Sequence, residues 1–379
     1  MKWEKVEIRS VCEGIYDGPH ATPPMSDNGA IFLGISNITA DGHLDFSDIK
    51  YINEQDLPKW TKRVTPREGD IVFSYEATLN LYAMIPANFW GCLGRRMALI
   101  RPNPKKINGK YLYYYFFSEQ WRSVIAENIV TGATVDRIPL IRFPQFPIYL
   151  PSLEIQNKIA SILSAYDDLI ENNKKQIKLL EEAAQRLYKE WFVDLRFPGH
   201  ENVPVVDGVP DGWEKCTITD LLNIGYGKDH KKLSDGDIPA YGSGGIFRKV
   251  NQKLHSGEAV LIPRKGTLNN IIHVDSDFWT IDTMFFGVPK IENCAKYAYF
   301  YLRYQDMYSY NIGAAVPSMT VNILDGMELL LPTKLMLENF ERTIEPLFSK
   351  QKLLTKQNET LTLSRDFLLP KLMSGEIEV

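Results

Sequence analysis

The chain carries one series of sequence landmarks twice, in the same order. Each copy begins with Trp-Glu-Lys, continues through a glycine-led apolar run and an aromatic stretch, and ends on Leu-Pro. The paired landmarks are residues 3–5 and 213–215, 69–73 and 257–261, 111–116 and 297–302, 131–135 and 312–316, and 150–151 and 331–332. The last two pairs are separated by the same offset of 181 residues. This duplication predicts two copies of one structural unit, related by a pseudo-twofold internal repeat.

After each Leu-Pro, the sequence changes to one long helical pattern. Apolar residues step by three and four from Ser152 to Phe192, and again from Leu337 to Leu368, which is the spacing of a coiled-coil seam. A helix of about 40 residues is about 60 Å long, too long to lie inside a small globular domain. We therefore predict two long, antiparallel, coiled-coil-like helices. The first seam consists of Ile155, Ile159, Ile162, Tyr166, Leu169, Ile177, Leu180, Ala184, Leu187 and Trp191.

Polar residues interrupt both seams. Asn173 occupies a seam position in the first pattern, and Gln351 and Asn358 do so in the second. Such residues either fix the register of a helix pair or leave a wet spot between the helices. The sequence leaves both possibilities open.

The rest of each half mixes strand-like and helical stretches. Residues 30–35, 97–100 and 259–262 are short apolar runs typical of strands, and residues 110–127 have helical spacing. The predicted fold class is α/β, with two mixed α/β domains separated by the long helices. The predicted segments are a first domain at 1–150, a long helix at 151–194, a connector rich in Pro, Gly and Asp at 195–212, a second domain at 213–331, and a second long helix with a C-terminal tail at 332–379.

Composition and charge exclude several classes of protein. The chain has an ordinary globular composition, and its net charge of −4 gives no global basic signature, so a nucleic-acid-binding face has to be a local patch. The four cysteines and six histidines are scattered without metal-ligand spacing, so we expect reduced thiols and no sequence-local zinc site. No signal peptide and no run of about 18 apolar residues is present. We expect a soluble, cytoplasmic chain without membrane association.

No sequence motif marks an active site. A GxxxxGK[ST] phosphate loop, an Asn-Pro-Pro-Tyr or Asp-Pro-Pro-Tyr run, a strand-linked GxGxxG turn, a GxSxG elbow and an HExxH helix are all absent. We therefore predict a non-catalytic protein that holds no cofactor or metal of its own. An enzyme with an unrecognised site is the less favoured alternative, because no convergent set of His, Asp, Glu or Ser is visible.

Basic and polar residues gather in loops of both halves. Around residues 228–249 and 264–266, Lys and Arg are interleaved with small residues, which suits close approach to a phosphate backbone, and Arg, Ser and Tyr can read base edges. The same residues also fit a solvated surface, Ser74 and Tyr75 fit a plain strand end, and the aromatic run 111–116 fits a core helix. The candidate DNA contacts are Ser74, Tyr75, Arg95, Arg96, Thr134, Arg137, Lys228, His230, Lys231, Lys232, Tyr241, Ser243, Arg248, Arg264 and Lys265.

These landmarks together resemble the specificity subunit of type I restriction-modification systems over essentially the whole chain. The first long helix ends in residues 189–194, similar to the family's Trp-Phe-containing segment. The second ends in residues 365–375, which match the family pattern Arg-x-x-Leu-Leu-Pro-x-Leu-x-x-Gly. Residues 131–151 resemble the family's entry into its helical spacer. One departure is residues 333–338, which lack the Glu-Ile-Gln run present at 154–156.

The resemblance implies a sequence-specific DNA-binding subunit without catalysis. Each mixed α/β part would be a target recognition domain that reads one half of a bipartite, asymmetric target in double-stranded DNA, and the helices would set the spacer. The expected partners are type I methyltransferase subunits, two copies, and restriction subunits. S-adenosylmethionine, ATP and Mg²⁺ are expected on those partners. The alternative is a coiled-coil scaffold whose duplicated domains bind protein or carbohydrate and have no role with DNA.

Overall fold

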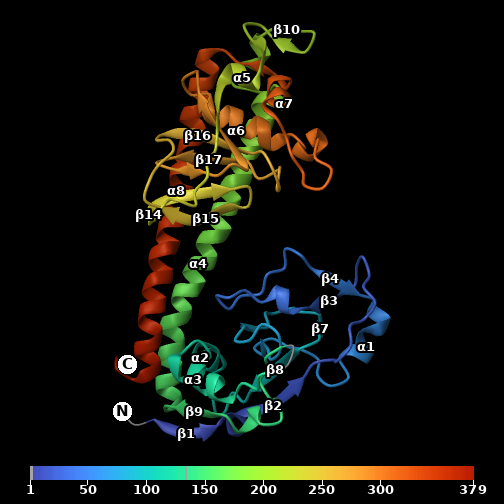
Figure 1. The fold of residues 1–379 in the computed structure, drawn as a ribbon, viewed down its shortest axis with the longest axis vertical. Helices are drawn as coiled ribbons and strands as arrows, with labels where there is room; N and C mark the ends of the chain where they lie inside the picture. The colour runs from blue at the N-terminus through green and yellow to red at the C-terminus, as the bar shows by residue number, and fades with distance from the viewer. Residues whose placement is uncertain (1–2, 133–134) are drawn as a thin grey trace. The chain divides into compact units, whose positions relative to one another are not determined.

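The computed structural model describes residues 3–132 and 135–379. The chain divides into two compact units: the residues up to Lys174 together with Lys356–Val379, and Lys175–Thr355 (Figure 1). Each unit takes one stretch of both long helices, α4 (Leu153–Tyr188) and α8 (Lys334–Ser374). Among the described residues, no helix combines the length and apolar character that a bilayer crossing requires. The units are defined by which residues pack together, so each contains a globular part and the helix segments that pack on it.

Three sheets form the globular part of the first unit. A four-stranded sheet has the order β2-β8-β5-β6, a three-stranded sheet has the order β4-β3-β7, and β1 pairs with β9. Among these strands only β3 and β7 pair in parallel. The strands are β1 (Glu4–Glu7), β2 (Cys12–Asp17), β3 (Ala30–Leu33), β4 (Lys50–Ile52), β5 (Ile71–Ser74), β6 (Tyr82–Met84), β7 (Gly91–Leu93), β8 (Met97–Pro102) and β9 (Pro147–Leu150), and the helices are α1 (Leu57–Trp60), α2 (Gly109–Tyr115) and α3 (Glu119–Asn128).

The second unit repeats these three sheets. Their orders are β13-β19-β16-β17, β15-β14-β18 and β12-β20, and the parallel pair is β14 with β18. A small hairpin of β10 (Val205–Val206) and β11 (Val209–Pro210) precedes them. The other strands are β12 (Glu214–Thr217), β13 (Leu222–Tyr226), β14 (Asp235–Gly242), β15 (Gly245–Val250), β16 (Glu258–Pro263), β17 (Ile272–Asp275), β18 (Trp279–Thr280), β19 (Met284–Pro289) and β20 (Glu328–Leu331), and the helices are α5 (Ile218–Leu221), α6 (Ala295–Tyr304) and α7 (Val321–Asp325).

Strand pairing confirms the predicted duplication and fold class. The Trp-Glu-Lys landmark leads into β1 in one unit and into β12 in the other. Both strands pair with the strand that ends at the Leu-Pro landmark, so that Glu4 lies opposite Leu150 and Glu214 lies opposite Leu331. Landmarks far apart in sequence thus mark the same position in two equivalent α/β units.

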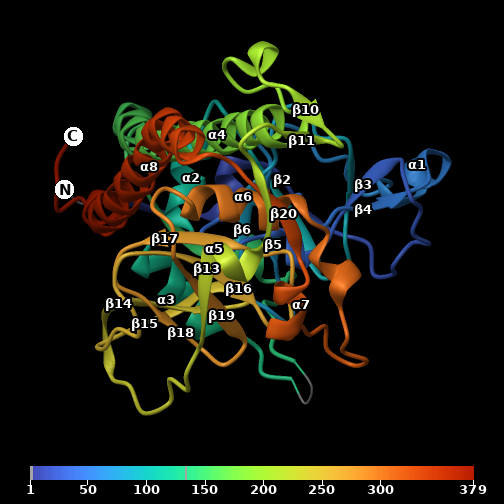
Figure 2. The same cartoon turned by 90° about the horizontal axis from the view of Figure 1, so that it is seen from above.

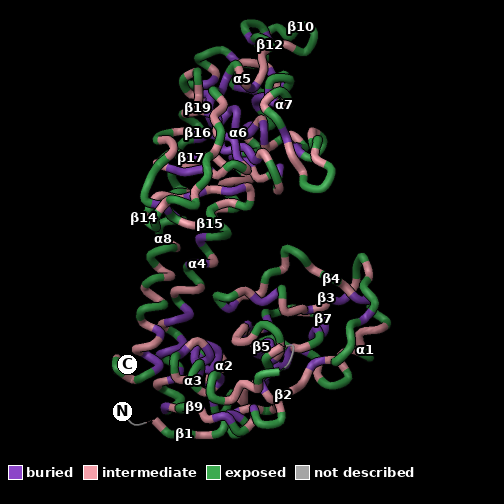
Figure 3. Tube along the Cα trace, viewed as in Figure 1, coloured by how far each residue is buried: buried purple, intermediate pink, exposed green. Residues whose placement is uncertain are grey.

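The aromatic run of the first unit lies in its core. Residues 111–116 are all buried, as their helical spacing favoured, and lie with β5 among the buried segments of the tube in Figure 3. The single helix expected over 110–127 is two helices, α2 and α3. The reason is local: the Ser118 hydroxyl accepts a hydrogen bond from the backbone N–H of Trp121 at 3.2 Å and caps the start of α3.

Within the first unit, the start of α4 packs antiparallel on the end of α8. The Arg365 guanidinium pairs with the Asp167 carboxylate at 2.6 Å, and the Asn173 amide donates to Oδ1 of Asn358 at 2.9 Å. Because residue numbers rise along one helix while their partners fall along the other, the predicted antiparallel pairing holds in this unit. Asn173 is buried, so this polar seam position is a hydrogen-bonded pair that specifies register.

The seam prediction is wrong at one residue of the first long helix, which is exposed and not buried. Leu169 is 48% exposed, whereas its neighbour Ile170 is only 5% exposed. The cause is a second packing partner: the Tyr114 hydroxyl of α2 donates to Asp167 at 2.5 Å, so α4 is covered by the α/β part as well as by α8. A helix covered on two sides buries a different stripe from that of a two-stranded coil.

Within the second unit, α4, α8 and α6 enclose an aromatic cluster. Phe340 of α8 is completely buried, with its ring centroid 4.8 Å from that of Phe192 and 5.7 Å from that of Trp191. Phe192 in turn contacts Tyr297 of α6 at 4.7 Å. Helix α6 lies between the four-stranded sheet and the long helices (Figure 2). This cluster anchors the helices to the sheet.

Candidate nucleic-acid interface

Candidates far apart in the first half of the sequence meet where β5 ends. The backbone N–H of Tyr75 donates to the carbonyl of Arg96 at 3.2 Å, and the Tyr75 carbonyl accepts from the N–H of Ile138 at 2.7 Å. The end of β2 joins them, because the Gly18 N–H donates to the Met97 carbonyl at 2.9 Å. Four chain segments therefore converge at one edge of the four-stranded sheet.

The second unit has the same backbone arrangement where β16 ends. The N–H of Arg264 donates to the Thr283 carbonyl at 2.8 Å, and the Arg264 carbonyl accepts from Met319 at 2.9 Å. The end of β13 joins through the Gly227 N–H, which donates to the Met284 carbonyl at 3.0 Å. The hydrogen bonds make Arg264 the structural counterpart of Tyr75, and Tyr226 the counterpart of Asp17.

A glycine recurs at equivalent positions in the two copies of a shared landmark. A Cβ atom at Gly132 would collide with the carbonyl oxygen of Val135, and one at Gly313 would collide with that of Val316. Only glycine tolerates so close a backbone approach. This requirement explains why residues 131–135 and 312–316 are a shared sequence landmark.

Five residues of the first unit lie at this edge of the sheet, some of them through their side chains and some through their backbone. We call Asp17, Tyr75, Glu76, Arg96 and Arg137 the first strand-end cluster. The Arg96 guanidinium pairs with Glu76 at 3.1 Å from a left-handed backbone (φ 69°), a costly conformation that tertiary contacts hold in place. Burial and the neighbouring Asp17 carboxylate raise the pKa of Tyr75, so its phenol stays a hydrogen-bond donor. Arg137 is exposed and bridges to Glu76 through its backbone.

The other predicted DNA contacts of the first unit differ in their exposure to solvent. Ser74 is completely buried and its hydroxyl donates to the carbonyl of Thr78, so it shapes the turn and offers no surface to DNA. We therefore remove Ser74 from the interface. Arg95 is exposed next to Arg96 at the start of β8. Thr134 lies outside the described residues.

In the second unit, Arg264 is the centre of the equivalent arrangement. Its guanidinium carbon lies 5.7 Å from the ring centroid of Tyr226 and 5.9 Å from that of Phe285, distances at which a cation is attracted to a ring face. Lys265 is exposed beside it, and Ser243 lies against Gly266. We call Tyr226, Ser243, Arg264 and Lys265 the second strand-end cluster.

The basic loop after β13 adjoins this cluster. The Lys228 carbonyl accepts from the indole N–H of Trp279 at 3.0 Å, while the side chains of Lys228, Lys231 and Lys232 are exposed. His230 packs its ring edge-on against Phe247 at 4.8 Å. The loop is thus anchored by its backbone and leaves its three ammonium groups in solvent.

Of two further candidates of the second unit, Arg248 has structural partners and Tyr241 is partly covered. Arg248 pairs with the Asp235 carboxylate at 2.7 Å and donates to the Leu233 carbonyl at 3.1 Å, so it holds the start of β14 against β15. Tyr241 is half-buried, and burial raises the pKa of its phenol. Arg248 therefore acts mainly within the fold, where sequence reasoning placed it among the DNA contacts.

Sequence reasoning missed a basic group in the first unit. Lys59, Trp60, Lys62 and Arg63 line a cavity of about 430 Å³ together with Asp17. The signal was present as the run Lys-Trp-Thr-Lys-Arg, an aromatic residue between cations. The run is not distinctive in sequence, because only folding brings these residues next to Asp17 of the first strand-end cluster.

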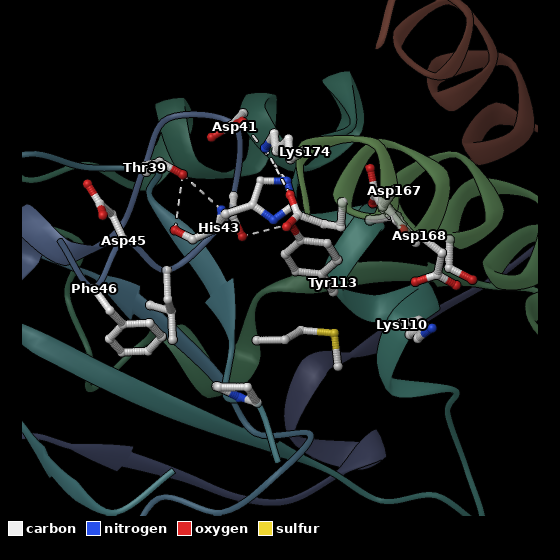
Figure 4. Close-up of a pocket in the computed structure, with 17 residues that line it drawn as sticks. Thr39, Asp41, His43, Asp45, Phe46, Lys110, Tyr113, Asp167, Asp168 and Lys174 are labelled. Carbon is white, nitrogen blue, oxygen red and sulfur yellow. Dashed lines mark hydrogen bonds and ion pairs between the residues drawn. The ribbon is translucent and has the colours of Figure 1, made fainter. Parts of the chain in front are cut away.

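Another cavity of the first unit has the opposite charge. It has a volume of about 520 Å³ and lies between the loop 39–46, α2 and α4, where the Tyr113 hydroxyl donates to the Gly42 carbonyl at 2.8 Å (Figure 4). Among the described residues, no group of three or more His, Cys, Asp or Glu is arranged to hold a metal ion. The excess of carboxylates makes this surface unsuited to a phosphate backbone. Its charged residues are Asp41, Asp45, Asp167, Asp168, Glu171, Lys110 and Lys174.

Comparison with known proteins places the chain in a family. A family model described as the type I restriction modification DNA specificity domain matches residues 1–182 and 210–362. The MjaIX type I restriction enzyme specificity subunit of Methanocaldococcus jannaschii is 26% identical over 373 residues, covering 86% of this chain and 82% of that protein. The HindI specificity subunit of Haemophilus influenzae is 22% identical over 427 residues, covering 88% and 91%.

A solved structure has the same fold. The S subunit of a type I restriction-modification system from M. genitalium superimposes with a TM-score of 0.58 at 18% identity, covering 98% of this chain and 96% of that one. Each of the two matched regions of the family model contains one copy of the sheet arrangement described above and a part of one long helix. The chain therefore belongs to the family of type I restriction-modification specificity subunits.

Proposed function

We propose that this chain reads a bipartite, asymmetric target in double-stranded DNA, with one α/β unit on each half-site. The observation that carries the proposal is the pair of strand-end clusters, in which one backbone arrangement presents two different sets of side chains. Equivalent positions hold Asp17 and Tyr75 in the first unit, and Tyr226 and Arg264 in the second. Different donors and acceptors on one scaffold are what an asymmetric target requires, because each base pair presents its own pattern in the major groove.

Arg264 is the base-reading residue that we assign to the second half-site. Two aromatic rings orient its guanidinium, and an oriented guanidinium makes a bidentate contact to O6 and N7 of guanine. Lys265 and the exposed lysines of residues 228–232 supply phosphate contacts, which position the protein without reading sequence. In the first half-site the corresponding groups are the exposed Arg95 and Arg137, beside the Tyr75 phenol, which is only 9% exposed.

The long helices set the spacer and dock the partner subunits in this proposal. Each unit leaves large apolar side chains of its helix segments in solvent, which is where a partner would bury surface. Two methyltransferase subunits would bring S-adenosylmethionine and flip the target adenine, and restriction subunits would bring ATP-dependent, Mg²⁺-requiring chemistry. The exposed apolar residues of α4 and α8 are Leu153, Leu169, Leu363 and Phe367 in the first unit, and Leu179, Leu335 and Leu353 in the second.

Co-expression with the neighbouring methyltransferase subunit tests the proposal. The complex is purified and adenine methylation is mapped on DNA of random sequence. A bipartite methylated motif is the expected result and supplies both half-sites and their spacing. A stable complex that neither methylates nor binds duplex would contradict the recognition role. Failure to form any complex would favour the scaffold alternative.

Arg264→Ala is expected to change recognition in one half of that motif only. Loss of a bidentate contact costs about 1–3 kcal/mol, or about 5- to 150-fold in discrimination, at one base pair of the second half-site. The measurement is the methylation motif and the duplex affinity of the assembled complex. Lys290→Ala, at the other end of β19, is the matched control and should leave both unchanged. An unaltered motif in the Arg264 variant would remove this residue from base reading.

A further inference from the structure

We propose that the cavity formed by Asp17, His20, Lys59, Trp60, Lys62 and Arg63 binds a backbone phosphate of the DNA flanking the first half-site. The inference rests on the proposed function and adds a contact to it. Phosphate contacts fix the register and orientation of a protein on the duplex, so this cavity would set how the first strand-end cluster meets the bases.

The cavity is built from separate parts of the first unit. Asp17 ends β2 and His20 follows it, Lys59 and Trp60 end α1, and Lys62 and Arg63 come directly after. Its volume of about 430 Å³ is large enough for a phosphate and its sugar neighbours. The shape therefore depends on the tertiary fold, although the cations are close in sequence.

The charge of the cavity favours an anion. Its one carboxylate, Asp17, is paired through Oδ2, which Arg63 contacts at 3.0 Å and His20 at 2.6 Å, whereas its buried Oδ1 has no hydrogen-bond partner among the described residues. Both ion pairs described for the cavity residues end on this carboxylate, which leaves Lys59 and Lys62 as exposed ammonium groups without an ion-pair partner among the described residues. Arg63 also donates to the Gly18 carbonyl at 2.7 Å, which fixes its head group in place.

A buried hydrogen-bond donor without a partner also supports a phosphate as the ligand. The indole Nε1 of Trp60 is buried and has no hydrogen-bond acceptor among the described residues, and an indole N–H can only donate. Leaving such a group unmatched is costly, and an explanation is expected for it in a native fold. A phosphate oxygen would accept from this donor and from the neighbouring ammonium groups, and a water bound with it would donate to the unmatched Oδ1 of Asp17. The Lys59 ammonium already lies 5.5 Å from the Trp60 ring.

The position of the cavity continues the proposed interface. Asp17 pairs with Ala98 of β8, and the Gly18 N–H bonds to the Met97 carbonyl, directly after Arg95 and Arg96. In the second unit the loop after the equivalent strand β13 carries the exposed Lys228, Lys231 and Lys232. Both units therefore place cations beside their strand-end cluster, although the first recruits them from a different loop.

The test uses the complete complex with its methyltransferase subunits and a duplex that carries the mapped motif. Affinity is measured by fluorescence anisotropy over a series of salt concentrations for wild type and for Lys59→Gln/Lys62→Gln. We expect weaker binding, a salt dependence reduced by about 1 to 2 in the slope of log K against log salt, and an unchanged motif. Lys105→Gln/Lys106→Gln, at the other end of β8, removes equal charge and should not change the slope.

Neutral methylphosphonate linkages locate the contact. One linkage beside the first half-site should weaken wild-type binding and have no further effect on the Lys59→Gln/Lys62→Gln complex. An unchanged slope in this variant overturns the cavity proposal while leaving DNA recognition intact. A reduced slope with additive effects of every methylphosphonate also overturns it, because the lysines then act only through the general field. Absence of wild-type duplex binding would instead contradict the proposed function.

Discussion

Lys296→Ala should destabilise the second unit by about 2–4 kcal/mol, because it removes a buried cation, the packing of its aliphatic stem and its ion pairs to three partly exposed carboxylates. The Lys296 side chain is 5% exposed, and its ammonium lies 3.2 Å from Glu258, 2.5 Å from Glu341 and 2.9 Å from Glu345. Burial opposes its charge, but the hydrogen bonds to Glu341 and Glu345 outweigh it and raise the pKa of Lys296. The cluster joins α6 and α8 to β16, the strand that ends directly before Arg264.

Urea unfolding of the full chain and hydrogen exchange of α6 peptides measure this effect. The deficit of the variant should shrink as pH falls, because carboxylates that have lost their cation bind protons more readily in the folded than in the unfolded chain. Lys334→Ala is the matched control: its pair with Glu292 at 3.5 Å is about three-quarters exposed on both sides, and its removal should cost less than about 1 kcal/mol. Equal stability of the two variants would contradict the assignment.

Trp121→Ala is expected to cost the first unit about 3–5 kcal/mol through the cavity it leaves. Trp121 is completely buried in the core, with its ring centroid 4.9 Å from Phe116 and 5.7 Å from Phe143. Its indole N–H also donates to the Tyr82 hydroxyl at 2.8 Å, and Tyr82 is only 1% exposed. The variant therefore loses packing and a buried hydrogen bond together.

Two further variants separate these contributions. Trp121→Phe keeps most of the ring packing and removes the indole donor, so its loss in urea unfolding should be clearly smaller than that of Trp121→Ala. Trp90→Ala removes an indole that is 46% exposed and should change stability little. A Trp90 variant as unstable as Trp121→Ala would show that the core of this unit lies elsewhere.

Much of the fold could be predicted from order and spacing in the chain. The repeated landmarks predicted two equivalent units, and strand pairing places Glu4 with Leu150 and Glu214 with Leu331 as that duplication requires. Step lengths of three and four predicted the long helices, because an amphipathic stripe is local information. The prediction that Leu169 is buried failed because α2, which covers α4 on a second side, comes from another part of the chain.

The candidate interface was predictable in its residue types and much less so in its grouping. Arg264 lies against the ring of Tyr226, two residues before Lys228, although 32 positions separate Lys232 from Arg264 in sequence. Arg248 and Ser74 look equally suitable in sequence, yet one is committed to Asp235 and the other is buried. Whether a polar side chain faces solvent or the fold depends on contacts that no local pattern records.

The sequence by itself determined the duplication, the long helices and the family, because each is written in the order and period of residues along the chain. Only the tertiary structure decided which residues are counterparts. Tyr75 and Arg264 are chemically dissimilar, and they correspond because each makes equivalent backbone hydrogen bonds at the end of equivalent strands, β5 and β16. Long-range pairing of strands brings such positions together, so the site emerges only when the chain folds.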